Sequence, residues 1–212
     1  MKKFFNILIS LLVFTSFIIT TNAYFLESLN AANYLADLCI IVKKSNDKDY
    51  NLDKFVLRQE VAAVARWVAW LNKKAVCENE FKDVSATKPN SWICYSAEAL
   101  RDAWIIAKND YFNPENKITK AEALGMMVKA AWFDYNYDPS KNTSWQKQLV
   151  DYASYKWIVW NFTDYNTLAT RWWVFEAWEK SLKIIKNWKI NSDWNVDVDP
   201  DVENILKELF SE

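Results

Sequence analysis

The feature that most constrains this chain is a shortage of glycine: its 212 residues contain one glycine, Gly125, and thirteen tryptophans. Average usage near 7% would supply about 15 glycines. Glycine takes positive φ readily at helix ends, whereas other L residues cost about 1–2 kcal/mol there. Trp104 and Trp157 each follow a helical run and precede two branched apolar residues. Tryptophan therefore occupies positions where a left-handed helix end favours glycine.

This pattern leads to a hypothesis about the gene. In a lineage that decodes UGA as glycine, a translation that assigns UGA to tryptophan places Trp wherever the cell inserts Gly. Most of the tryptophans in this sequence would then be glycine in the cell. For example, Asn187–Lys189 and Asp193–Asn195 would become Asn-Gly and Asp-Gly turns.

The first two dozen residues predict a secretory signal peptide. A basic start is followed by the apolar stretch 4–14, and 21–23 ends in a small residue. We expect cleavage after Ala23, which removes residues 1–23 and exports the mature chain to the cell surface or cell wall. A retained anchor is the alternative, because the stretch 4–20 is just long enough to span a bilayer. No later segment is apolar enough to do so.

Composition excludes several functions. The chain has no histidine, which removes histidine-dependent nucleophiles and histidine-ligated zinc sites. A net charge of −1 gives no general attraction to nucleic acid or anionic lipid. The alternating acids at 193–199 lack the order of an EF-hand loop. We interpret 191–212 as an acidic tail in which 200–210 forms a short amphipathic helix. We predict no metal ion, no cofactor and no catalysis.

Export permits disulfides, and the chain has three cysteines. Cys77 and Cys94 lie in one loop-rich stretch, so a bridge between them is the favoured pairing. The chain-entropy model gives such a bridge about 3 kcal/mol of stabilisation. Cys39 then stays unpaired within the apolar run Leu38–Val42. We predict a buried, inert thiol at this position.

Three segments repeat one order of parts: a helix, a break followed by two branched apolar residues, a polar loop, and a second helix opened by a cation. Such units predict an all-α fold. We divide the mature chain into units 24–75, 76–135 and 136–190. The breaks fall at Cys39, Trp104 and Trp157, and the second helices open at Leu57–Arg58, Thr119–Lys120 and Thr170–Arg171.

The middle unit has the clearest local signals. Its first helix is predicted from about Ser96 to Ala103, and its second from Thr119 to about Ala131. Thr119 is a suitable N-cap, and Glu122 follows three residues later, as in a capping box. The start of this second helix is therefore encoded locally.

These residues resemble the S-layer homology module. Its pattern runs Phe-x-Asp-Val, a first helix with tryptophan, Gly-Ile-Ile, a loop ending before Pro, and Ile-Thr-Arg-Ala-Glu. The middle unit matches at Phe81, Asp83, Val84, Trp92, Ile105, Ile106, Phe112, Pro114, Ile118, Thr119, Ala121 and Glu122. Trp104 occupies the glycine of the pattern, and Lys120 its arginine. The resemblance covers about 26–186 and is weaker in the outer units, where Leu57 replaces threonine and Trp172–Trp173 replace Ala-Glu.

The resemblance implies a pseudo-threefold bundle that binds an anionic cell-wall polysaccharide between its units. Arg58, Lys120 and Arg171 lie in the first turns of their helices, where an incoming anion would offset a cation's unfavourable interaction with the helix. Alternatively, these cations are solvated or pair with Glu60 and Glu122. The predicted ligand-binding residues are Arg58, Thr119, Lys120, Thr170, Arg171, Trp92 and Asp83.

The resemblance also sharpens the gene hypothesis, because the module favours a real tryptophan near the start of the first helix. It implies that Trp92 and Trp145 are genuine and that Trp104 and Trp157 are glycine. Local context makes glycine plausible at most of eight further tryptophans, which are Trp67, Trp70, Trp132, Trp160, Trp172, Trp178, Trp188 and Trp194.

Two other functions stay open. An exported scaffold or adhesin would use the same bundle to contact S-layer or other surface proteins. A glycosidase could work with a carboxylate pair and no histidine, but no pair in this sequence differs from ordinary surface acids.

Overall fold

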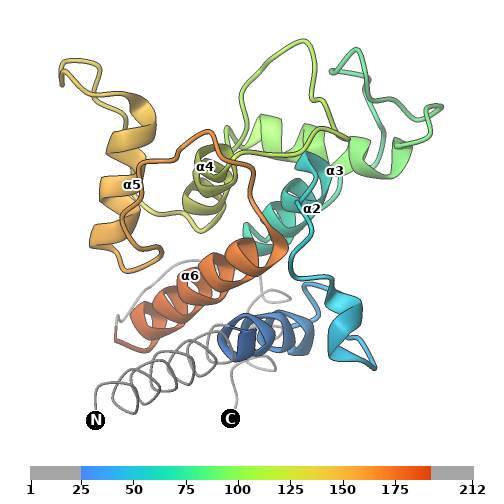
Figure 1. Ribbon diagram of the computed structural model, residues 1–212. Coiled ribbons are helices and arrows are strands. Elements are labelled where there is room, and N and C mark those ends of the chain that lie inside the picture. Colours follow the sequence, from blue (N-terminus) through green and yellow to red (C-terminus); the bar gives the residue numbers. More distant parts are fainter. Residues whose placement is uncertain (1–24, 192–212) are drawn as a thin grey trace, which may run out of the picture.

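The computed structural model describes residues 25–191, with side chains to residue 186, as an assembly of helices (Figure 1). This part of the chain contains isolated β-bridges but no strand, which confirms the all-α prediction. None of its helices is both long enough and apolar enough to cross a membrane. A helical segment at 25–37 precedes η1 (Asp47–Tyr50), α2 (Arg58–Val68), α3 (Ser91–Asp102), α4 (Lys120–Ala130), α5 (Trp145–Tyr155) and α6 (Arg171–Asn191).

The α-helical segments fall two to each predicted unit. The segment 25–37 and α2 lie in the first unit together with the short η1, α3 and α4 lie in the second, and α5 and nearly all of α6 lie in the third. The unit boundaries themselves stay a prediction. The predicted signal peptide, the acids at 193–199 and the helix at 200–210 lie outside the described residues.

Helix starts follow the local signals. The Thr119 hydroxyl accepts the N–H of Glu122 (3.3 Å), and Glu122 Oε2 accepts the N–H of Thr119 (3.0 Å), which completes the expected capping box. At α2, Glu60 Oε2 accepts the N–H of Leu57 (2.8 Å), but leucine has no side-chain acceptor to return the bond. Only α3 differs clearly from the expectation, because it begins at Ser91, five residues before the predicted start at Ser96.

Five helix ends in the described chain share one backbone conformation. The residue after each cap has φ between 55° and 62°, in the left-handed region: Cys39, Trp70, Trp104, Trp132 and Trp157. At each end the following N–H donates to the carbonyl five positions earlier, as Ile105 does to Leu100 (2.9 Å). This is the 6→1 bond of a Schellman motif. The left-handed ends predicted at Trp104 and Trp157 are present, and the same geometry recurs at Trp70 and Trp132.

One local prediction was wrong. Cys39 is exposed rather than buried, because its left-handed position at the helix end directs the side chain away from the core that Ile40 and Ile41 pack against. Residues 187–189, which are predicted to form a turn if position 188 is glycine, lie inside α6 with tryptophan at that position.

Three short segments meet in a closed ring of backbone hydrogen bonds. Val56 donates its N–H to Ala169 (3.0 Å), Ala169 to Ile118 (2.9 Å), and Ile118 to Val56 (3.1 Å). Each of these residues lies two positions before the cation that opens α2, α4 or α6. The ring therefore brings the starts of three helices from three parts of the chain to one place.

Helix α4 lies at the centre of the helix contacts. It packs against α2, α5 and α6, and α2 packs in addition against α3. The cluster of buried apolar side chains runs through all these helices, and Trp178 of α6 is among its largest fully buried members. Packing around α4 therefore sets the spacing between neighbouring helix starts.

Candidate functional site

The three cations that open the second helices pair with carboxylates from other parts of the chain. The Arg58 guanidinium donates to Glu122 Oε1 of α4 (3.0 Å). Arg171 donates to Glu60 Oε1 of α2 (2.6 Å), and Lys120 Nζ donates to Asp164 Oδ2 in the loop before α6 (2.7 Å). Arg58 and Arg171 thus pair with Glu122 and Glu60, the carboxylates that the alternative expectation named. Each of the three pairs links a helix start to another predicted unit.

Glu122 has two tasks at the start of α4. Burial favours its neutral form, but the N–H of Thr119 and the charge of Arg58 stabilise the carboxylate and hold its pKa below the ordinary value. The carboxylate also faces the positive end of the α4 dipole. Glu122 therefore stays ionised at neutral pH and fixes the position of Arg58.

A first groove, the α4 groove, has a volume of about 460 Å³. The Arg58–Glu122 pair lies at one part of its wall, and the indole of Trp145, at the start of α5, lies at another. Ile105 and Ile106 supply apolar floor from the segment after α3. The remaining lining residues are Ala107, Gly125, Met126, Lys129, Tyr135, Asn136, Tyr137 and Leu149.

A second groove, the α2 groove, has a volume of about 310 Å³ and the same plan. Its wall holds the Arg171–Glu60 pair and the indole of Trp92, at the start of α3. Ile40 and Ile41 supply apolar floor, again from the segment directly after a helix. The remaining lining residues are Val42, Lys44, Asp49, Tyr50, Val56, Val61, Ala63, Val64, Val174 and Phe175.

Each groove thus combines parts of three units: the isoleucine pair of one, the first-helix tryptophan of the next, and the second-helix arginine of the third. The indoles are half-exposed, at 48% for Trp92 and 40% for Trp145. An aromatic face beside a guanidinium can hold an apolar sugar face and an anionic group at the same time.

Three of the seven residues predicted to bind ligand line these grooves, namely Arg58, Arg171 and Trp92. Lys120 and Thr170 lie at equivalent helix starts but line neither groove. Thr119 caps α4.

Asp83 has a clear structural task. Its two carboxylate oxygens accept the N–H groups of Phe112 (2.9 Å) and Asn113 (2.6 Å), and so fix the loop before Pro114. Asp83 lines neither described groove.

Sequence reasoning missed Trp145 as a site residue. A usable signal was present, because both tryptophans lie in the first turn of a first helix: Trp145 is the first residue of α5, and Trp92 is the second residue of α3. It also missed Lys44 and Lys129, which add positive charge to the α2 and α4 grooves. Neither lysine belongs to the repeated pattern, so no local signal marks them.

Comparison with known proteins gives one similarity of interest. The chain is similar to a cell-wall protein. It is 28% identical over 141 residues to the middle cell wall protein of Brevibacillus brevis (strain 47 / JCM 6285 / NBRC 100599). The match covers 64% of this chain and 13% of that relative, so the chain corresponds to a small part of the longer protein. No family model matches the chain.

The Arg58–Glu122 pair makes a testable contribution to acid stability. Because the folded-state pKa of Glu122 is lowered, its contribution is present above the unfolded pKa and is lost as pH falls through the folded pKa. We expect Glu122→Gln to lower the free energy of unfolding at pH 7 and to flatten its decrease on acidification below about pH 4.5. Urea titrations at a series of pH values measure both effects. The exposed Glu115→Gln serves as control, and an unchanged pH profile in Glu122→Gln would contradict the assignment.

Proposed function

We propose that this chain is exported and attaches to the cell envelope by binding an anionic cell-wall polysaccharide, without catalysis. The observation that carries the proposal is the repeated groove plan, in which tryptophan, an isoleucine pair and an arginine come together from three units. The similarity to a cell-wall protein supports it. The ring of hydrogen bonds at Val56, Ile118 and Ala169 supports the pseudo-threefold bundle that the proposal needs.

The chemistry of the α4 groove suits a charged sugar. The indole of Trp145 offers a flat apolar face, and Arg58 offers charge-assisted donors. Arg58 pairs with Glu122 through Nη1, and 23% of its side chain stays exposed. A ligand carboxylate can therefore approach the guanidinium while the pair with Glu122 persists.

Binding to purified cell-wall polymer tests the proposal. We expect Trp92→Ala and Trp145→Ala each to weaken binding about threefold to tenfold, because each removes one stacking face worth about 0.5–1.5 kcal/mol. Arg58→Gln and Arg171→Gln should weaken it by about tenfold or more and reduce its salt dependence. Pull-down against increasing NaCl measures both quantities.

Tyr155→Ala is the matched control, because Tyr155 is an exposed aromatic residue that lines neither groove. Binding that is insensitive to all four groove variants would contradict the proposal. Lys120→Ala is informative as well: it lines neither described groove, so it should reduce binding less than Arg171→Ala does.

A second candidate is a surface scaffold or adhesin that contacts proteins and does not bind glycan. The observation that favours it is the neutralisation of all three helix-opening cations by carboxylates. It predicts no retention on the polymer at any salt concentration. Retention that is lost in the arginine variants would exclude it.

We also propose that the tryptophans at the left-handed helix ends are glycine in the cell, inserted at UGA codons. Four such ends carry tryptophan, and the indoles of Trp104 and Trp157 are 68% and 74% exposed, so burial offsets little of the backbone strain. Trp67, Trp172 and Trp178 lie inside helices, where glycine would cost about 1 kcal/mol. The backbone conformation therefore favours glycine most clearly at Trp70, Trp104, Trp132 and Trp157.

Mass spectrometry of the protein isolated from its own cells tests this proposal. Trypsin releases Trp104 in the peptide 102–108, between Arg101 and Lys108. We expect this peptide to have the mass of the glycine form. A peptide 102–108 that carries tryptophan would refute the proposal, and the peptide containing Trp92 provides the internal reference for a genuine tryptophan.

A further inference from the structure

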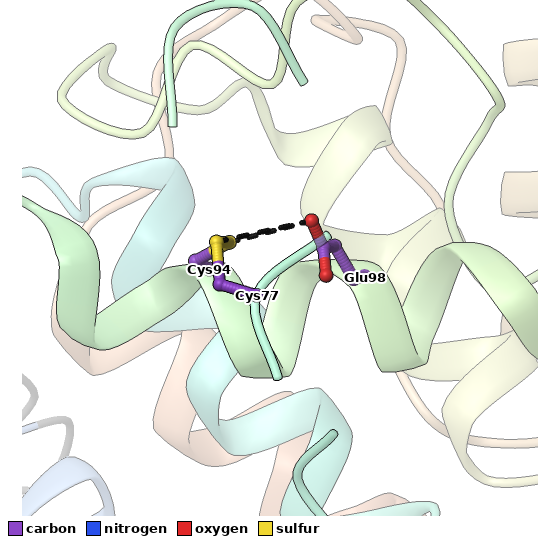
Figure 2. Close-up of side chains that lie close together, drawn as sticks. All are labelled: Cys77, Cys94 and Glu98. Carbon is purple, nitrogen blue, oxygen red and sulfur yellow. Dashed lines mark hydrogen bonds between the residues drawn. A yellow bond between two sulfur atoms is a disulfide. The ribbon is translucent and has the colours of Figure 1, made fainter. Parts of the chain in front are cut away.

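The disulfide between Cys77 and Cys94 lies beside a buried carboxylate that the grooves do not use. Cys94 and Glu98 lie one turn apart on α3, and Cys77 comes from the loop before it. Glu98 has 0% of its surface exposed, and both cysteines are buried. Figure 2 shows the Glu98 carboxylate pointing toward the two sulfur atoms. Burying a carboxylate is expensive unless it has partners, so the contacts of Glu98 need an explanation.

Backbone donors satisfy part of this carboxylate. Oε2 accepts the N–H of Glu78 (2.8 Å), and Oε1 accepts the N–H of Glu80 (3.0 Å). The same Oε1 lies 3.4 Å from Cys94 Sγ and 4.0 Å from Cys77 Sγ. A carboxylate oxygen accepts more than one interaction, so Oε1 has a lone pair left on the side that faces the sulfurs.

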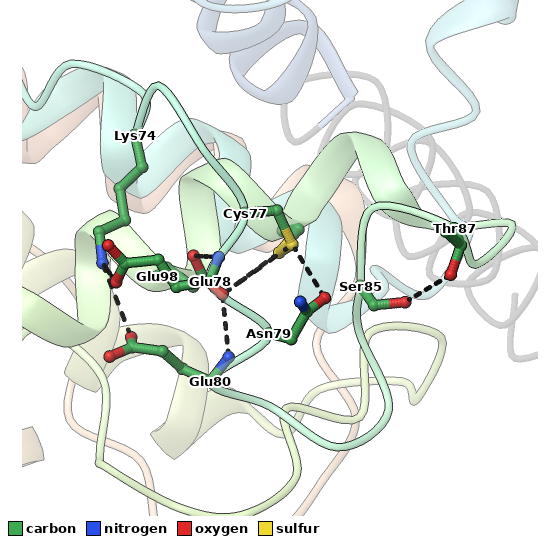
Figure 3. Close-up of a disulfide and its surroundings, with 9 residues drawn as sticks. Lys74, Cys77, Glu78, Asn79, Glu80, Ser85, Thr87 and Glu98 are labelled. Atoms are coloured by element: carbon green, nitrogen blue, oxygen red, sulfur yellow. Dashed lines mark hydrogen bonds and ion pairs between the residues drawn. A yellow bond between two sulfur atoms is a disulfide. The ribbon is translucent and has the colours of Figure 1, made fainter.

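A fourth donor atom lies beside one of the two sulfurs. Asn79 is exposed, and its Oδ1 is 3.7 Å from Cys77 Sγ (Figure 3). In a tetrahedral zinc site with Zn–S near 2.3 Å and Zn–O near 2.1 Å, sulfur and oxygen ligands lie about 3.6 Å apart. The distances from Glu98 Oε1 to the two sulfurs, 3.4 and 4.0 Å, and the distance from Asn79 Oδ1 to Cys77 Sγ, 3.7 Å, bracket that value.

The acidic side chains around the cluster are already neutralised. Lys74 pairs with Glu78 (2.5 Å) and Asp102 (2.9 Å), and Arg101 pairs with Glu80. Among the carboxylates around the disulfide, Glu98 of α3 is the one that lies against both sulfurs.

We propose that reduction of the Cys77–Cys94 disulfide converts this cluster into a site for a thiophilic divalent cation such as Zn²⁺, held by both sulfurs, Glu98 and Asn79. A dithiol reductant supplies two electrons and two protons: the S–S bond breaks, two thiols form, and the reductant becomes a disulfide. Metal binding then releases the two thiol protons to water as the thiolates coordinate. The sulfurs separate to about 3.8 Å, the spacing that tetrahedral Zn–S bonds require. In oxidised protein the same atoms hold the bridge and no metal.

Cobalt binding by the full chain tests this proposal. The protein carries Cys39→Ser, so that the exposed third thiol does not contribute, and it is kept reduced with a phosphine. We expect one Co²⁺ per chain, with thiolate-to-cobalt charge-transfer absorption and the visible bands of a tetrahedral site, displaced by Zn²⁺. The oxidised protein should bind none. Equal cobalt binding in the two redox states would overturn the proposal.

Two variants distinguish a preorganised metal site that includes Glu98 from metal binding by the two thiols alone. Glu98→Gln removes the anionic oxygen and should weaken Co²⁺ binding about tenfold or more, whereas Glu78→Gln, in the same loop but directed toward Lys74, should leave it unchanged. Circular dichroism shows whether the reduced chain is folded. If it is unfolded and both variants bind Co²⁺ equally, two flexible thiols explain the binding and the proposal is wrong. Neither result of the cobalt experiment affects the test of polysaccharide binding, because that test uses the oxidised protein.

Discussion

We expect the simultaneous replacement of Trp70, Trp104, Trp132 and Trp157 with glycine to raise the free energy of unfolding by about 3 kcal/mol. Each indole side chain sits on a residue with φ between 55° and 62°, which costs an L residue about 1–2 kcal/mol. Glycine removes this strain, but it also lowers stability by about 0.5–1 kcal/mol at each site, because the unfolded chain gains conformational freedom. The Trp132 indole donates to the carbonyl of Ala69, beside Trp70 (3.4 Å), so we expect the effects at Trp70 and Trp132 to be less than additive and those at Trp104 and Trp157 to add. A chain of this size should melt roughly 10 °C higher, which calorimetry measures.

The control for this prediction is Trp67→Gly. Trp67 lies inside α2, where glycine weakens a helix by about 1 kcal/mol, so this variant should be less stable than the parent. A loss of stability in the fourfold variant would show that the indoles contribute more through packing than they lose through backbone strain. This measurement tests the backbone strain at the four positions. It does not test which codons the gene carries there.

We expect the replacement of Glu98 with alanine to lower the free energy of unfolding by about 3 kcal/mol. The substitution leaves the N–H groups of Glu78 and Glu80 without their charged acceptor, and each unpaired donor costs about 1–3 kcal/mol when it stays away from water. It also leaves a space beside the disulfide, since Glu98 is fully buried. Urea unfolding of the oxidised protein measures the effect.

Glu78→Ala is the matched control for that loss. Glu78 belongs to the same loop, but its side chain is exposed and pairs with Lys74 at the surface, where ion pairs contribute about 0–1 kcal/mol. Its removal should change stability by less than about 0.5 kcal/mol. Similar losses in both variants would mean that the loop, and not the buried carboxylate, determines stability here.

Local chemistry explains which parts of this fold can be predicted from sequence. The capping box of Thr119 and Glu122 and the left-handed ends at Trp104 and Trp157 depend on residues only a few positions apart. Cys39 shows how such signals mislead, because an apolar neighbourhood suggested burial. Its position at the helix end, equivalent to Trp104, determines its exposure.

The candidate site depends on longer-range contacts. Arg171 pairs with Glu60 across 111 positions, and Arg58 with Glu122 across 64. A sequence shows that each helix opens with a cation, but not which carboxylate the fold brings to it. The grooves also required the arrangement of three units around α4, which no single helix encodes. Trp145 could have been added by applying the logic of Trp92 to the third unit.

The ring formed by Val56, Ile118 and Ala169 has a consequence for how the chain folds. Each member donates to one segment and accepts from the other, so no pair of units satisfies all its polar groups while the third is absent. The ring joins positions 113 residues apart, which makes its closure a slow, late step compared with formation of any one helix. The three units should therefore fold in a single cooperative transition. A fragment of two units should stay partly folded, and it should expose an unpaired backbone N–H and an unpaired C=O that can bind other chains.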